Sequence, residues 1–65
     1  MWYIVVVEQW VHYDSEFSKV RSIPVYAVSY DMAVSGATEG MTCYCIQQVI
    51  SVGRCKPVIE MDENW

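Results

Sequence analysis

Apolar residues dominate the start of the chain in the manner of a β-strand. Residues 2–11 read WYIVVVEQWV, in which only Glu8 and Gln9 are polar. Residues 16–28 have strand character again, with Pro24 inside the run. Because proline has no N–H to donate to a ladder, the second strand is predicted to be an edge strand or to contain a bulge. The two runs are expected to form an antiparallel hairpin.

The connection between these strands, WVHYDSEFSK at residues 10–19, contains turn residues and large aromatic residues together. Asp14 and Ser15 favour a turn, because their side chains can bond nearby backbone groups. Trp10 and Phe17 flank that turn, and we expect them to pack across the hairpin.

After residue 28 the strand character ends, and apolar residues recur with the period of a helix. Ser29 is a suitable N-cap, Asp31 suits the positive end of the helix dipole, and Gly40 is a suitable residue just past the end. Small residues on the inner face would allow the helix to lie close to a sheet. The face predicted to point inward has the i, i+3, i+4, i+7, i+11 spacing: Tyr30, Ala33, Val34, Ala37 and Met41.

The same period places Met32, Ser35 and Glu39 on the outer face of the helix. Methionine is a flexible side chain that can fill an irregular pocket on a partner. Single exposed apolar residues are also common on ordinary protein surfaces. The outer face is therefore a candidate contact surface. The alternative is that Met32 is an ordinary exposed residue without a partner.

Strand character returns at residues 43–50, and the turn that follows leads to a possible short strand at 55–60. Pro57 would make that last strand an edge strand. Residues 60–65 are expected to form a flexible tail. The predicted fold is α+β in the order ββαββ, with one helix across an antiparallel sheet. Residues 1–65 are expected to be a single domain.

The net charge of −4, with only four basic residues, disfavours direct nucleic-acid binding. An acidic protein instead suits a basic surface on a protein partner, including a surface that holds RNA or DNA. The apolar start has no basic region before it and is too short to span a bilayer. We therefore expect a cytoplasmic protein without membrane contact.

Candidate chemistry is sparse. Cys43, Cys45 and Cys55 are an odd number of cysteines, which disfavours a disulfide framework, although a single disulfide or a link between chains stays open. With His12 they could form a zinc site, but C-x-C is not the usual spacing. A thiol enzyme using Cys43 and Cys45 is a further alternative. The expectation is free thiols, with no catalytic residue, metal or cofactor.

The hairpin segment contains the pattern W-x-x-x-[DE]-S-x-F-[ST]-K, filled here by Trp10, Asp14, Ser15, Phe17, Ser18 and Lys19. In this pattern it is similar to the Dmd (discriminator of mRNA degradation) antitoxins of T-even-type bacteriophages. The resemblance implies a non-enzymatic protein made in the cytoplasm of an infected bacterium. It also implies binding to host mRNA endoribonuclease toxins of the RnlA or LsoA type, in a groove where the antitoxin blocks access of RNA.

The resemblance also assigns positions on the helix. The family tryptophan that enters the toxin groove corresponds to Met32, and a family asparagine just past the helix corresponds to Met41. Aromatic anchors usually contribute most of the binding energy, so the methionine puts affinity for the same toxin in doubt. With the outward-facing Ser35 and Glu39, the predicted toxin-binding set is Met32, Ser35, Glu39 and Met41. The protein itself is expected to be a monomer or a weak homodimer.

A second resemblance starts later in the chain. Residues 23–40, IPVYAVSYDMAVSGATEG, resemble the strand and helix of a small bacteriophage inhibitor of bacterial RNA polymerase. That inhibitor is also a helix on a short antiparallel sheet. The resemblance implies an arginine pair in the strand after the helix, and this chain has only Arg54 near that place. Inhibition of RNA polymerase by protein contact is therefore the alternative function.

Overall fold

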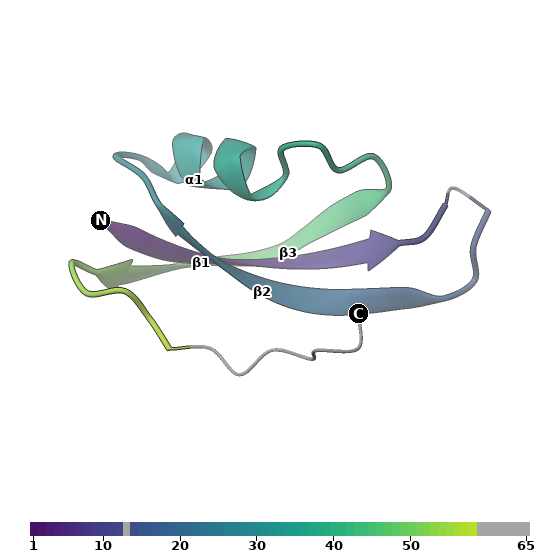
Figure 1. The fold of residues 1–65 in the computed structure, drawn as a ribbon, viewed down its shortest axis with the longest axis horizontal. Coiled ribbons are helices and arrows are strands. Elements are labelled where there is room, and N and C mark those ends of the chain that lie inside the picture. Colours follow the sequence, from purple (N-terminus) through teal and green to yellow (C-terminus); the bar gives the residue numbers. More distant parts are fainter. Residues whose placement is uncertain (13, 59–65) are drawn as a thin grey trace.

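The computed structural model describes residues 1–12 and 14–58, and these residues form three strands and one helix (Figure 1). The helix lies across one face of the sheet. In chain order the elements are β1 (Trp2–Trp10), β2 (Ser18–Tyr26), α1 (Tyr30–Ala37) and β3 (Tyr44–Gly53).

The sheet has the order β2-β1-β3, and both pairings are antiparallel. The first strand of the chain is therefore the central strand, with Val5 paired to Ile23 on one side and to Val49 on the other. Since β2 and β3 both run opposite to β1, they run parallel to each other. The segment with α1 connects them by crossing over β1.

The predicted order ββαββ is wrong, because the described chain has the order ββαβ. Residues 55–58, which were predicted to begin a last strand, form no strand. Gly53 ends β3 with a φ of +128°, and Pro57 has no N–H for a ladder. Beyond that turn Lys56 reaches the sheet through its side chain, with Nζ 5.8 Å from the Trp2 ring centroid.

The broad α+β class is correct. The end of the predicted last strand and the predicted tail at 60–65 lie outside the described residues. The position predicted for Pro24 is confirmed, because β2 is an edge strand.

The turn before β2 is longer than the sequence suggested. Ser15 Oγ donates to the Phe17 carbonyl at 3.0 Å and accepts from the Phe17 N–H at 3.2 Å. The Ser15 N–H also donates to the His12 carbonyl at 3.0 Å. These bonds hold residue 17 in the connection, so β2 begins at Ser18. The predicted turn role of Ser15 is confirmed.

The helix begins where the sequence predicts and ends earlier. Ser29 is the N-cap, and its Oγ accepts from the Met32 N–H at 3.3 Å. At the other end Thr38 still donates its N–H to the Val34 carbonyl, but the Met41 N–H donates to the Thr38 carbonyl. That bond closes a turn in which Gly40 has a φ of +80°. Gly40 therefore has the left-handed conformation expected of it, two residues beyond the C-cap.

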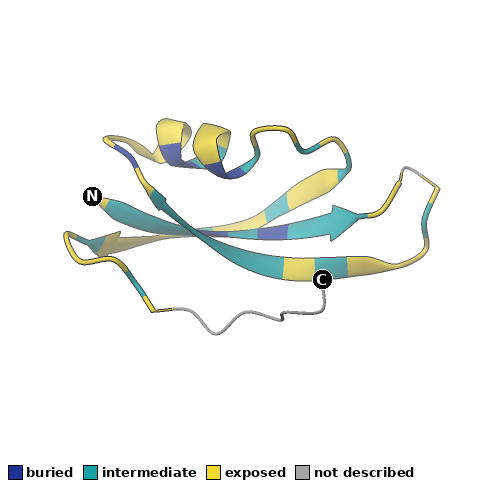
Figure 2. Ribbon diagram, viewed as in Figure 1, coloured by how far each residue is buried: buried dark blue, intermediate teal, exposed yellow. Residues whose placement is uncertain are grey.

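The core lies between α1 and the central strand, and it is made of small side chains (Figure 2). Larger residues around it are only partly buried, among them Ile23, Val25 and Ile46. Small helix residues allow close packing, as the sequence predicted. The buried residues are Val5, Val7, Ala27, Ala33 and Ala37.

Candidate interaction surfaces

The outer face of α1 is exposed at the three positions that the helical period assigns to it. Met32 is 56% exposed, and Ser35 and Glu39 are also exposed. On the opposite side of the helix, Ala33 and Ala37 are buried against the sheet. The predicted orientation is confirmed, and a contact with a toxin stays a prediction.

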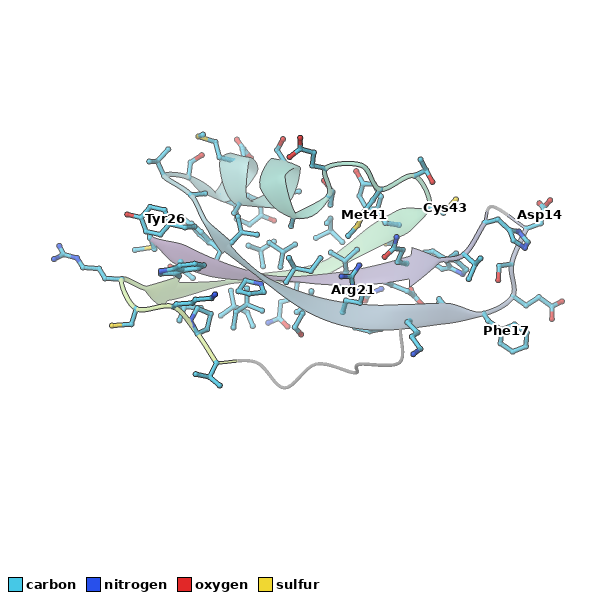
Figure 3. All side chains as sticks on the ribbon, viewed as in Figure 1. Asp14, Phe17, Arg21, Tyr26, Met41 and Cys43 are labelled. Atoms are coloured by element: carbon cyan, nitrogen blue, oxygen red, sulfur yellow. The ribbon has the colours of Figure 1, made fainter. Side chains whose placement is uncertain are left out.

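Met41 does not join this outer face. It is half-buried and packs against the core, and Figure 3 shows it between the end of α1 and the sheet. The inward position suggested by the helical period is correct, although Met41 lies in the turn after the helix. A contact through the Met41 side chain would therefore require its removal from the core.

Tyr30 was predicted to point inward, and this prediction is wrong, because the residue is 56% exposed. A Cβ atom added at Gly36 would lie only 3.4 Å from Val25 Cγ1, so helix and sheet are close together. We infer that a tyrosine ring does not fit into this narrow layer. Val28, at 79% exposure, and Met32 extend the apolar surface at the start of the helix.

The tip of the β1–β2 hairpin also presents apolar side chains. Phe17 is 80% exposed, and it projects from the tip in Figure 3. Packing of Phe17 across the hairpin is therefore a wrong prediction. The reason is the pair of Ser15–Phe17 hydrogen bonds, which keeps Phe17 outside the ladder. Val11, at 79% exposure, lies on the other arm of the connection.

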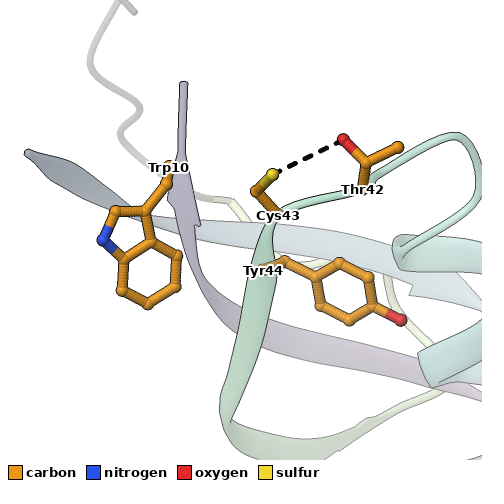
Figure 4. A pocket seen from close by; sticks show the side chains of 4 residues that line it. All are labelled: Trp10, Thr42, Cys43 and Tyr44. Carbon is orange, nitrogen blue, oxygen red and sulfur yellow. Dashed lines mark hydrogen bonds between the residues drawn. The ribbon is translucent and has the colours of Figure 1, made fainter. Parts of the chain in front are cut away.

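Trp10 contributes to a different place. Its backbone N–H donates to the backbone carbonyl of Cys43 at 2.9 Å, which extends the pairing between β1 and the start of β3. Together with Thr42, Cys43 and Tyr44 it lines an open pocket of about 290 Å³ (Figure 4). The Thr42 hydroxyl donates to Cys43 Sγ at 3.8 Å. This pocket could not be predicted from the sequence, because its walls depend on the sheet order.

The three cysteines lie in and around β3, among the described residues. Cys43, Cys45 and Cys55 are free thiols, and the last two are exposed. Residues 1–12 and 14–58 contain no group of three or more side chains that could hold a metal ion. His12 is exposed in the hairpin connection. The zinc arrangement considered from the sequence is therefore not formed by these residues.

The second face of the sheet, away from α1, is the largest apolar feature that the sequence did not indicate. Residues of β1 alternate between the two faces, so Ile4 and Val6 lie opposite the buried Val5 and Val7. We call this surface the open face. On β1 it comprises Trp2, Ile4, Val6, Glu8 and Trp10.

Comparisons with protein-family models, curated proteins and solved structures find no match. In the part of the chain that the structure describes, no helix has the length and apolar character needed to cross a membrane.

Proposed function

We propose that this protein is a phage antitoxin of the Dmd type, which binds a host mRNA endoribonuclease of the RnlA or LsoA type and sterically blocks its RNA-binding active site. The observation that supports this most is the exposure of Met32. The resemblance assigns a groove-entering side chain to this position, and the described chain presents 56% of the residue to solvent.

The charge of the same helix supports a basic partner. Asp31 lies in the first turn and Glu39 follows the last, and both are exposed. The last turn has no basic residue, and the whole chain has a net charge of −4. A nuclease groove that holds RNA is rich in positive charge, so this helix would be attracted to it.

The helix is also held firmly enough to act as a wedge. The Ser29 cap bonds the backbone N–H of Met32 itself, at 3.3 Å. On the inner face Ala33 and Ala37 pack with Val5 and Val7 of the central strand. Because the backbone of this helix is already ordered, it loses little conformational freedom on binding, which favours affinity.

Replacement of an aromatic anchor by Met32 lowers the area available for contact. Tyr30 and Val28 add apolar area beside it, at 56% and 79% exposure. The proposed contact is therefore a group of three apolar side chains at the helix start, with Ser35 and Glu39 along the outer face. Met41 is a secondary contact at most, because it packs against the core.

Co-expression with an RnlA-type or an LsoA-type toxin tests the proposal. The wild-type chain should restore growth and form a complex that survives purification. Met32→Asp should weaken the complex at least ~30-fold, the effect of losing a hot spot of about 2 kcal/mol. Val11→Asp is the matched control, since it introduces the same charge at a 79% exposed valine on the hairpin. Absence of both rescue and complex with either toxin would refute the proposal.

One observation favours the alternative, inhibition of bacterial RNA polymerase by protein contact. Residues 23–40 fold as the end of β2 followed by α1, as that resemblance implies. However, β3 contains no arginine, and Arg54 lies just after its end. Binding of the purified chain to RNA polymerase, lost on Arg54→Ala, would support this alternative in place of the antitoxin.

A further inference from the structure

The open face carries apolar side chains on all three strands, and Ser22 and Gln48, which pair with Val6, interrupt them. On the flanking strands its members include Val20 and Tyr26 of β2, which are 62% and 64% exposed, and Ile50 of β3, which is 39% exposed. Pro24 pairs with Ile4 between them. In the described chain α1 covers the opposite face, and Figure 1 shows it there. Exposed apolar surfaces of this kind mark interaction sites.

The small core explains why this surface would be used. Among the described residues, the bulkiest side chains with full burial are the valines Val5 and Val7, in a chain of 65 residues. Chains of this size commonly need disulfides, a metal or association to be stable. The three cysteines are free, and the described residues offer no group of metal ligands. Association of two copies through this face would add apolar burial.

Two opposite charges lie at opposite ends of the open face. Glu8 accepts from Ser18 Oγ at 2.7 Å and from Gln47 Nε2 at 3.0 Å. Lys56 Nζ lies over the ring of Trp2, six positions from Glu8 along β1. At about 3.3 Å per residue these two places on the strand are ~20 Å apart.

We propose that two copies of this chain associate through their open faces, with the two β1 strands antiparallel across the interface. In this arrangement Glu8 of each copy comes towards the end of the other copy that carries Lys56. The parallel arrangement would bring the two Glu8 carboxylates together instead. The charges therefore favour a second copy, and they also select its direction.

The size of the face fits a modest homodimer. Nine residues of β1 span about 30 Å, and three strands about 4.8 Å apart span about 14 Å. The flat area of the face is therefore roughly 420 Å² per copy, or ~850 Å² for two copies, and protruding side chains add to it. A standard stable interface buries about 1,200–2,000 Å² in total. The estimate lies below that range, so we expect a weak, reversible dimer.

The proposed dimer is independent of the proposed toxin contact. Its interface is on the sheet face opposite α1, so the outer face of α1 stays accessible in both copies. A substitution of Met32 should therefore affect toxin binding and leave self-association unchanged. A substitution on the open face should affect self-association first.

Sedimentation equilibrium of the full chain, over a wide range of concentration, tests the proposal. The mass should rise from 7.5 kDa to twice that value. Val6→Lys should abolish association, and Val20→Lys should weaken it without a risk to folding, because Val20 is 62% exposed in a single copy. Met32→Asp, the control, should associate like the wild type.

The direction is tested by charge exchange. Glu8→Lys should raise the dissociation constant ~10-fold, a typical effect of an unfavourable charge pair. The double variant Glu8→Lys with Lys56→Glu should regain most of the loss. A chain that stays monomeric at every concentration overturns the proposal. So does association that ignores both Val6→Lys and Val20→Lys, or a double variant without recovery.

Discussion

The position of Gly36 on α1, beside Val25 of β2, leads to a specific prediction about stability. Gly36 lies inside the helix, next to the buried Ala37. A Cβ atom added there would meet Val25 Cγ1 at 3.4 Å, the short end of ordinary van der Waals contact. The neighbour is one methyl group of a half-buried side chain, which can shift by a few tenths of an ångström. We therefore expect Gly36→Ala to be tolerated.

The magnitude follows from two terms. Alanine is favoured over glycine inside a helix by about 0.8–1.0 kcal/mol. The close contact with Val25 takes back part of this, and a small new apolar contact adds to it. A net gain of about 0.5–1 kcal/mol is expected. For a domain of this size that corresponds to a rise in Tm of roughly 2–8 °C.

Thermal and urea unfolding followed by circular dichroism measure this gain. Gly40→Ala is the matched control, because Gly40 has a φ of +80° and nothing within 4 Å of an added Cβ atom. It should destabilise the fold by about 1–2 kcal/mol through backbone strain alone. If Gly36→Ala also destabilises the protein, the layer between helix and sheet is too tight to admit a methyl group. The argument from the 3.4 Å contact would then be refuted.

Three other substitutions test separate parts of the structure by the same unfolding measurements. Ser29→Ala removes the acceptor of the Met32 N–H and should cost about 1 kcal/mol, whereas an unchanged stability would show that the cap is dispensable. Phe17→Ser should change stability by less than about 0.5 kcal/mol, because the ring is 80% exposed, and a larger loss would place the ring in the core. Met32→Asp should also stay within about 0.5 kcal/mol, and a large drop would mean that the helix face is assigned backwards.

Local features of this fold could be predicted from the sequence because they depend on nearby residues. The apolar run around Val5 identified β1, and the hydroxyl of Ser29 identified the start of α1. The missing N–H of Pro24 identified an edge strand. Each of these signals acts within one element, so neighbours far along the chain do not alter it.

The failures share a different cause. The sequence contains no local sign that β1 lies between β2 and β3, since the two pairings are chosen by the whole fold. The open face could therefore not be recognised, because a strand with one uncovered face reads like a buried strand. Phe17 and Tyr30 were misplaced for a related reason. Their hydrophobic character suggested burial, but Phe17 is held outside the ladder by its bonds to Ser15, and Tyr30 is 56% exposed at the start of α1.

For the candidate contact surface on α1, the sequence predicted which helix side chains face outward better than it predicted which residues belong to the surface. Met32, Ser35 and Glu39 lie on the outer face as the helical period indicated. Met41 packs against the core. The resemblance therefore placed an inward-facing residue in the same contact set as three outward-facing ones. Val28 was not identified at all, because it precedes the helix and its exposure depends on the turn out of β2.

The central position of β1 also governs how the chain can be made. Trp2 pairs with Gly53, so the sheet joins nearly the two ends of the described chain. Contacts this distant in sequence form late and slow down folding. While the protein is being synthesised, one edge of β1 stays unpaired until β3 has been made. During that interval the unpaired edge can recruit other strands. Synthesis of β3, rather than growth of the first half of the chain, therefore determines when the complete sheet can form.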